Sequence, residues 1–462
     1  MFRRFASLER VHFVGIGGAG MSGIAEVLSD YDLEVTGSDL ALSQTTRRLE
    51  RAGVKVIEGH DPANVAGADL VVVSSAVPTD NPERLAAQQQ GIPVVRRAEM
   101  LGELMRMKYG IAVAGTHGKT TTTSLVGALM TETGFDPTVI VGGRLRVSGT
   151  GARLGRSEYL VAEADEYDRS FLRLQPIIAI ITSIDRDHLD TYADLAEIEQ
   201  AFMSFADKVP FFGQVILCLD DENIQRLLPR LADHRVVTYG MSPQAQLRAI
   251  EIVPTERGSR FQVVHGVDGV LGWLEIPMPG RHNVQNALAA VAVGLALGLG
   301  FDKIAQALSG FGGVHRRFER LGTWRGAHVV DDYAHHPTEV AATLSAARQA
   351  FPNAVVHAVF QPHLYSRTRD LHEEFGRSLL AADWAWVTDI YGSREQPVPG
   401  VNADLVVDAA RRSGHRHCQG GGVWSSLPPR LAETVKAGDV VLTLGAGDIY
   451  RLAKQLVAEE AT

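Results

Sequence analysis

The chain has 462 residues, of which 45% are hydrophobic and 21% are charged, and its formal net charge at pH 7 is -9. A chain of this length predicts about three domains, each large enough to build its own core. The acidic balance argues against broad binding to nucleic acid or to anionic membranes. Two cysteines, Cys218 and Cys418, offer neither metal-ligand spacing nor a disulfide framework. No apolar run reaches the ~18 residues of a membrane span, so we expect no transmembrane helix.

The first hundred residues alternate short apolar strands with helical patterns. Strands are predicted at residues 11–14, 33–36, 69–73 and 93–95, and helices at 21–29 and 97–107. This alternation is typical of a parallel sheet covered by helices. We therefore expect residues 1–107 to form a Rossmann-like α/β domain.

A glycine turn follows the first predicted strand. Its sequence, GIGGAG from Gly15 to Gly20, fits the dinucleotide fingerprint, with Asp39 about 20 residues further on. Taken alone, the turn indicates an NAD-dependent oxidoreductase. Physically it provides a diphosphate site at a helix N-terminus, which suits a UDP-sugar equally well. The rest of the chain shows no hydride-transfer apparatus, so we favour a UDP-linked substrate. Its candidate ligands here are Gly15, Gly17, Gly18, Ala19, Gly20 and Asp39.

A second glycine turn, AGTHGKTTTT from Ala114 to Thr123, lies between a predicted strand at 111–113 and a predicted helix at 124–130. Strand, glycine turn, Gly-Lys-Thr and helix is the arrangement that cradles phosphates. The strict P-loop pattern needs a glycine where Val113 stands, so this loop is shorter. Lys119 is expected at the outer phosphates of ATP, and the Thr120 hydroxyl at its magnesium ion. The candidate ATP ligands are Gly115, Thr116, His117, Gly118, Lys119, Thr120 and Thr121.

Two acidic clusters follow the next two predicted strands, at 159–163 and 177–182. The first, EADEYD, begins at Glu163, and the second, DRDHLD, contains His188. Either could be a solvated loop, but the carboxyl ends of parallel strands are where α/β sheets bind ligands. Glu163 is the best candidate for a magnesium ligand, and His188 for a second metal or a catalytic contact.

The remaining pattern completes two further domains. In the second, residues 108–312, we expect an amphipathic helix at 194–206, a small antiparallel β-ribbon within 247–276, and helices from Asn286 and at 302–309. Asn283 and Asn286 could cap the first of these helices or read an adenine edge. Gly312-Gly313 is a candidate hinge into the third domain, residues 313–462, where strands at 329–330, 354–360, 384–388 and 440–444 again predict a Rossmann-like fold.

Ten motifs in order resemble the Mur ligase family, which builds the peptide stem of bacterial peptidoglycan, and within it the branch that adds L-alanine. They are GIGGAGMSGIAEVL from Gly15, SSAV from Ser74, GTHGKTTT from Gly115, EADE from Glu163, DHLDTY from Asp187, GRHNVQNALAA from Gly280, HRRFE from His315, DDYAHHPTEV from Asp331, FQPHLYSRTRD from Phe360 and GAGDI from Gly445. The resemblance implies three domains that bind, in order, the UDP-linked substrate, ATP and the amino acid. It also implies ATP-dependent ligation of L-alanine to the carboxylate of UDP-N-acetylmuramic acid through an acyl phosphate.

The resemblance also implies roles for individual residues. It assigns the ATP phosphates to Lys119, magnesium to Thr120, Glu163 and His188, and the UDP-linked substrate to the first glycine turn and Ser74. His282, Asn283 and Asn286 match the adenine-side motif, and Arg317 and Asp332 match catalytic residues that close over the nucleotide. Tyr333, His335 and Arg367 match positions near the incoming alanine. No apolar signal core follows Arg3 and Arg4, so we expect a cytoplasmic enzyme, where ATP is available, and a monomer or a weak homodimer.

Some residues depart from the family pattern. Leu364 stands where many members carry arginine, and Tyr167 replaces a common serine. No lysine suited to carbamylation follows Asp187, as expected for the alanine-adding branch. Two alternatives stay open: a non-catalytic nucleotide-binding regulator, and the related recycling ligase that attaches a preformed tripeptide. Two motifs of the third domain could instead be purely structural. His335-His336-Pro337 could start a helix, and Arg316 could be a salt-bridge partner.

Overall fold

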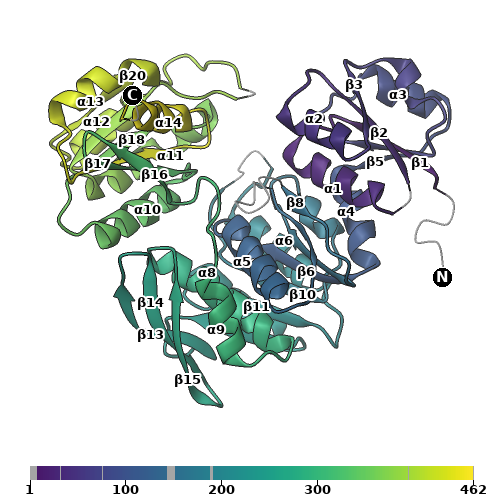
Figure 1. Ribbon diagram of the computed structural model, residues 1–462, viewed down its shortest axis with the longest axis horizontal. Coiled ribbons are helices and arrows are strands. Elements are labelled where there is room, and N and C mark those ends of the chain that lie inside the picture. The colour runs from purple at the N-terminus through teal and green to yellow at the C-terminus, as the bar shows by residue number, and fades with distance from the viewer. Residues whose placement is uncertain are drawn as a thin grey trace. The chain divides into compact units, whose positions relative to one another are not determined.

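A computed structural model describes residues 8–31, 33–74, 76–142, 151–187, 191–393 and 395–460, apart from the side chain of Ala19 (Figure 1). The chain divides into two compact units. The first comprises Met1–Ile250, Gln262–Leu274 and Gln285–Gly312, and the second Glu251–Phe261, Glu275–Val284 and Gly313–Thr462. Within the described residues, no helix is both long and apolar enough to cross a membrane.

The N-terminal part is a five-stranded sheet in which every neighbouring pair is parallel. In spatial order its strands are β3 (Lys55–Glu58), β2 (Glu34–Asp39), β1 (Arg10–Val14), β4 (Leu70–Val73) and β5 (Val94–Arg96). The helices are α1 (Ala19–Ser29), α2 (Gln44–Arg51), α3 (Pro82–Gln89) and α4 (Arg97–Arg106), with a short 3-10 helix η1 (Pro62–Val65). The strand order reverses at β1, and the first glycine turn lies at its carboxyl end, where open α/β sheets bind ligands.

Among the described residues, the central sheet has ten strands. In spatial order they are β15 (Gly269–Ile276), β14 (Ser259–His265), β13 (Leu247–Pro254), β12 (Val236–Gly240), β11 (Gln214–Cys218), β10 (Ile178–Ile181), β6 (Tyr109–Ala114), β9 (Tyr159–Glu163), β7 (Thr138–Ile140) and β8 (Ala152–Arg153). Strand β6 is parallel to both β10 and β9. Ile111, Ala112 and Val113 are fully buried, as expected for a strand that is covered on both faces.

Helices and short 3-10 helices connect these central strands. They are α5 (Lys119–Glu132), η2 (Ser170–Arg173), α6 (Leu195–Ala206), α7 (Glu222–Leu227), η3 (Leu228–Leu231), α8 (Arg281–Ala296) and α9 (Phe301–Ser309). Asp194 caps α6 by accepting a hydrogen bond from the Glu197 N–H, which explains why the predicted helix begins there. The predicted ribbon contains a third strand, β15, beside the two expected ones.

The C-terminal part is a six-stranded sheet. In spatial order it consists of β16 (Glu319–Trp324), β17 (Ala327–Asp332), β21 (Val440–Leu444), β18 (Val356–Phe360), β19 (Trp384–Thr388) and β20 (Cys418–Gly422). In the part of this sheet that the structure describes, β16 and β17 form the one antiparallel pair, and the other pairs are parallel. The helices are α10 (Pro337–Ala350), α11 (Tyr365–Ser378), α12 (Asp404–Arg412), α13 (Pro428–Thr434) and α14 (Tyr450–Glu460), with η4 (Leu379–Ala381) and η5 (Trp424–Ser426).

This last sheet has a core on each face. Val330 and Leu442 pack with α10, α11 and α12, whereas their neighbours Val329 and Val441 pack with α13 and α14. Successive residues of a strand point to opposite faces, so helices on both sides bury every residue of β21.

Candidate active site

The central glycine turn has a backbone that only glycine adopts easily. Gly115 has a φ of +129°, and a Cβ there would lie 2.1 Å from the Thr182 hydroxyl. Gly118, the N-cap of α5, is left-handed with a φ of +82°, and its Cβ would lie 2.6 Å from Asn286 Oδ1. The predicted strand, glycine turn and helix are therefore present, with the backbone drawn close to its neighbours.

Residues just after β10 hold this turn in place. The Thr116 N–H donates to the Ser183 carbonyl and the His117 N–H to the Ser183 hydroxyl, both at 2.9 Å. The Asp185 N–H in turn donates to the Thr116 hydroxyl at 2.9 Å, and the His117 ring lies 3.1 Å from an Asp185 oxygen. These hydrogen bonds within the protein therefore fix the conformation of the turn. Sequence reasoning missed Ser183, which carries no motif signal.

Lys119 forms a close ion pair with Glu166. Its ammonium donates to the two carboxylate oxygens at 2.8 and 2.9 Å, and to the Gly115 carbonyl at 2.8 Å. Burial is the largest single effect and lowers the pKa of Lys119, but the charges of Glu166, Asp165 and Glu163, with the hydrogen bond to Glu166, together raise the pKa above its usual value. A charged lysine therefore lies at the turn, as a phosphate site requires. Glu166 was missed because it is one of four carboxylates in six residues.

The Thr120 hydroxyl and the Glu163 carboxylate meet beside Lys119. The hydroxyl donates to both carboxylate oxygens at 3.0 Å, and the Gly142 N–H donates to one of them at 2.8 Å. Three oxygens from a hydroxyl and a carboxylate form a donor set that suits a hard cation such as Mg²⁺. His188, predicted as a further metal ligand, lies outside the described residues.

The two asparagines of the predicted adenine motif have different partners. Asn286 accepts a hydrogen bond from the Thr122 hydroxyl at 3.1 Å and lies against Gly118. Asn283 donates to the Pro279 carbonyl at 2.8 Å. Asn286 thus supports the phosphate turn, in addition to any contact with a nucleotide.

In the C-terminal unit, a second group of predicted residues lies together. Burial raises the pKa of Asp332 to about 6, although the nearby Arg317 charge opposes this. Burial and the same Arg317 charge lower the pKa of His282 to about 4. Arg317 also lies over the Tyr333 ring, 5.4 Å from its centroid, and the Tyr333 and His335 ring centroids are 5.3 Å apart. These five residues therefore form one cluster, and the perturbed pKa values of Asp332 and His282 within it are typical of functional sites.

The neighbouring Arg316 is built into the fold. Its guanidinium donates to Asp331 at 2.9 Å and to the Gly447 carbonyl at 3.2 Å, and it also bonds the Gly445 carbonyl. Of the two arginines in the motif, Arg316 thus has the structural role. Arg367 is half-buried on α11, which begins at the N-cap Leu364 with an unusual φ of +71°.

The N-terminal glycine turn is also preformed. The Ser38 carbonyl accepts from the N–H groups of Gly15 and Ile16 at 2.9 and 3.0 Å, and Asp39 accepts from the Gly17 N–H at 2.7 Å. A Cβ on Gly15 would lie 3.3 Å from the Ser74 side chain. Asp39 and Ser74, predicted to bind the same substrate, therefore both lie at this turn.

Family models match three consecutive parts of the chain. These are the Mur ligase family catalytic domain at residues 10–109, the Mur ligase middle domain at 113–294, and the Mur ligase glutamate ligase domain at 316–447. The chain belongs to the Mur ligase family. Its order of α/β domains is that of the family, so the expected three-domain fold is confirmed.

Individual relatives resemble the chain over nearly its full length. The UDP-N-acetylmuramate–L-alanine ligase of Salinibacter ruber is 52% identical, covering 97% of this chain and 94% of the relative. That of Trichlorobacter lovleyi is 50% identical, covering 98% and 99%. Among solved structures, the UDP-N-acetylmuramate-alanine ligase of Thermotoga maritima has a TM-score of 0.81 at 29% identity, covering 98% and 99%. As a Mur ligase, the chain is an ATP-dependent ligase.

Proposed function

We propose that this Mur ligase joins L-alanine to the carboxylate of UDP-N-acetylmuramic acid in peptidoglycan synthesis, with ATP as the energy source. The observation that carries the proposal is identity of about one half, over almost the whole chain, to ligases of that specificity. The charged Lys119 at a glycine turn supports the ATP-dependent step. Because the reaction draws on ATP, we place the enzyme in the cytoplasm.

The reaction needs activation because a carboxylate is a poor electrophile. A carboxylate oxygen of the substrate attacks the γ-phosphorus of ATP, the bond to ADP breaks, and an acyl phosphate forms. The alanine amine then attacks the acyl carbon, and the tetrahedral intermediate loses inorganic phosphate and a proton to give the amide. Lys119 and the N–H groups at the start of α5 offset the developing negative charge, and the protein aligns three substrates.

The Thr120 hydroxyl and the Glu163 carboxylate fit magnesium, because they already converge through 3.0 Å hydrogen bonds. Bound there, magnesium would act as a Lewis acid on the phosphate oxygens. By family resemblance, His188 would hold a second ion.

The other assignments follow the same resemblance. We assign the turn from Gly15 to Gly20, with Asp39 and Ser74, to the UDP-linked substrate. His282, Asn283 and Asn286 are assigned to the adenine side, and Arg317 and Asp332 to closure over the nucleotide. Tyr333, His335 and Arg367 are assigned to the incoming alanine. The clustering of His282, Arg317, Asp332, Tyr333 and His335 supports a common site.

The test is release of inorganic phosphate with each substrate omitted in turn. We expect turnover only when ATP, UDP-N-acetylmuramic acid and L-alanine are all present. A tripeptide offered in competition with L-alanine separates the synthetic ligase from the recycling one. Preference for the tripeptide would assign the chain to recycling, and nucleotide binding without any turnover would indicate a regulator.

A further inference from the structure

A buried carboxylate in the N-terminal sheet has no part in the chemistry assigned above. Glu83 lies on the first turn of α3 and is fully buried. It accepts hydrogen bonds from the Ser38 hydroxyl and the Asn64 amide, both at 2.5 Å, and the His60 ring nitrogen Nδ1 lies 3.0 Å away. His12 Nε2 lies 3.6 Å from the same carboxylate. A buried charge is costly unless hydrogen bonds replace its water, and here side chains from four separate segments do so.

The arrangement excludes a nucleophilic serine. In hydrolytic sites a histidine takes the proton of the serine, and a carboxylate orients that histidine from its other side. Here the Ser38 hydroxyl donates directly to Glu83, and a single nitrogen, His60 Nδ1, lies 3.0 Å from both groups. Ser38 is also fully buried, so its hydroxyl cannot meet a substrate. The cluster therefore has a different role.

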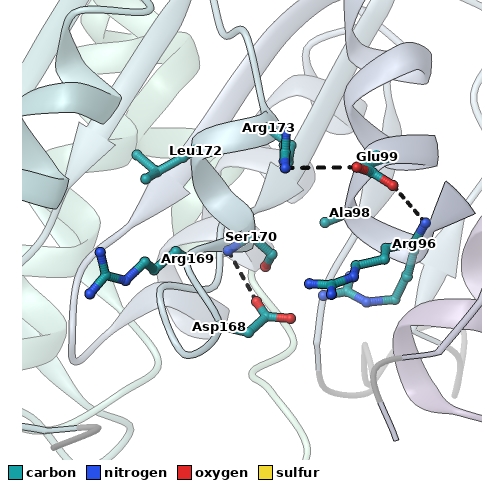
Figure 2. Close-up of a pocket in the computed structure, with 9 residues that line it drawn as sticks. Arg96, Ala98, Glu99, Asp168, Arg169, Ser170, Leu172 and Arg173 are labelled. Carbon is teal, nitrogen blue, oxygen red and sulfur yellow. Dashed lines mark hydrogen bonds and ion pairs between the residues drawn. The ribbon is translucent and has the colours of Figure 1, made fainter. Parts of the chain in front are cut away.

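Glu99 shows how a carboxylate on the first turn of a helix is used when its contacts are local. It lies on α4, in the same unit, and borders a cavity of about 230 Å³. Figure 2 shows its two partners, the Arg96 N–H at 2.8 Å and the exposed Arg173 guanidinium at 3.9 Å. Glu99 thus caps its own helix. In α3 that function belongs to Asn81, and the partners of Glu83 lie on β1, on β2 and after β3, so capping does not explain it.

Ser38 connects Glu83 to the first glycine turn. Val14, the last residue of β1, pairs with Ser38 on β2, so the turn begins beside this serine. The Ser38 carbonyl accepts from the N–H groups of Gly15 and Ile16 at 2.9 and 3.0 Å, while its hydroxyl donates to Glu83 at 2.5 Å. One residue thus contacts the turn with its backbone and the buried carboxylate with its side chain. Glu83 therefore restrains Ser38, and through it the path of the turn.

The path of the turn matters because it leads directly into α1. The first N–H groups of a helix have no acceptor within the helix and can bind a phosphate, so their position depends on the turn before them. We propose that Glu83 is a positioning residue for the nucleotide-linked substrate, which fixes the glycine turn in its binding conformation by holding Ser38. The proposal deepens the proposed function and rests on it for the identity of the substrate.

The first test measures UDP binding by calorimetry on the full-length wild type, on Ser38→Ala, on Glu83→Gln and on the double variant. Each single variant should weaken UDP binding about 10-fold, the effect of losing one hydrogen bond to a charged group, and ATP binding should not change. Because both substitutions break the same link, the double variant should bind UDP no more weakly than the weaker single variant. A loss of stability alone would lower the number of binding sites per chain and leave the Kd unchanged.

Asp69→Asn is the matched control. The Asp69 carboxylate also holds the backbone of β1, because it accepts from the N–H groups of Glu9 and Arg10 at 2.7 and 2.8 Å. These contacts lie at the amino end of the strand, opposite the glycine turn, so the control should keep the wild-type Kd for UDP. If Glu83→Gln does not fold, Ser38→Ala decides the question, because it leaves the carboxylate its other contacts.

Steady-state kinetics separate positioning from a direct part in the reaction. In Ser38→Ala and in Glu83→Gln, the KM for UDP-N-acetylmuramic acid should rise by the same factor as the Kd for UDP. The kcat and the KM values for ATP and L-alanine should not change, because the central turn and the C-terminal cluster are untouched.

Unchanged UDP affinity in Ser38→Ala would overturn the proposal, and so would additive losses in the double variant or an equal loss in Asp69→Asn. The two proposals fail in different ways. A wild-type protein that binds UDP, with non-additive losses in the variants, but forms no amide would refute the ligase and retain the role of Glu83. A wild-type ligase whose Ser38→Ala variant keeps its KM for the UDP-linked substrate would refute the role of Glu83 alone.

Discussion

Gly118→Ala probes why the phosphate turn needs glycine. Gly118 and Gly134 lie at opposite ends of α5 and have nearly the same φ, +82° and +88°. They differ in surroundings, because a Cβ on Gly134 would meet nothing within 4 Å, whereas one on Gly118 would lie 2.6 Å from Asn286 Oδ1. Gly134→Ala therefore measures the backbone cost alone, which is about 1–2 kcal/mol for a left-handed residue.

Gly118→Ala should cost more than its control. To avoid the new methyl group, the buried Asn286 side chain must turn away and release its 3.1 Å hydrogen bond from the Thr122 hydroxyl. Leaving a buried hydroxyl unpaired costs a further ~1–3 kcal/mol, so the total is about 2–5 kcal/mol.

Hydrogen exchange of the α5 amides, followed by mass spectrometry, measures the local opening free energy of each variant. Adding Asn286→Ala to Gly118→Ala should remove part of the extra destabilisation relative to Gly134→Ala, because the methyl group of Ala at position 118 then has space. Equal losses in Gly118→Ala and Gly134→Ala would refute the reasoning, since the contact with Asn286 would then have no energetic weight.

Three further changes test the electrostatics. Lys119→Ala should lower phosphate release by at least about 10²–10³-fold. The substitution is made together with Glu166→Gln, so that no buried carboxylate is left unpaired. If the double variant turned over nearly as fast as Glu166→Gln alone, Lys119 would have no part in the reaction. Glu163→Gln should raise the Mg²⁺ concentration for half-maximal activity at least about tenfold, measured by magnesium titration; an unchanged requirement would place the ion elsewhere. Glu83 is fully buried, and burial raises its pKa, but hydrogen bonds from Ser38 and Asn64 and the His12 ring 3.6 Å away bring the pKa down from 4.5 to about 2. A carboxylate whose pKa is lower in the folded than in the unfolded protein stabilises the fold at pH values above the unfolded-state pKa. Glu83→Gln should therefore lower the free energy of unfolding by about 3 kcal/mol at neutral pH. That deficit should shrink as the pH falls from 4.5 towards 2 in urea unfolding, and a pH-independent deficit would contradict the assigned charge.

Local patterns predicted the parts of the site that depend on neighbours in the chain. Strand β9 ends at Glu163 as predicted, and the strand, turn and helix around Lys119 follow from apolar runs and glycines alone. Contacts between residues that are far apart in the sequence could not be predicted from local patterns. Nothing local shows that Asn286 reaches Gly118, or that Ser183 holds the turn.

The same limit explains the choice among acidic residues. Glu163 was selected because it is nearest the strand, and Glu166 passed unnoticed in the same cluster. The structure separates them by direction: Glu163 meets the Thr120 hydroxyl, whereas Glu166 turns to Lys119. The directions in which these two side chains point are known only once the end of the strand and the following loop have been placed.

The ion pair between Lys119 and Glu166 has a consequence for inhibitor chemistry. In the free protein, the lysine is already neutralised by a carboxylate that is only 2% exposed. An uncharged compound that competes with ATP at the adenine side therefore gains nothing from Lys119, because it offers no better counterion. Only ligands with a polyanionic tail can draw the lysine away from Glu166, so screening hits that lack one should be insensitive to substitution of either residue.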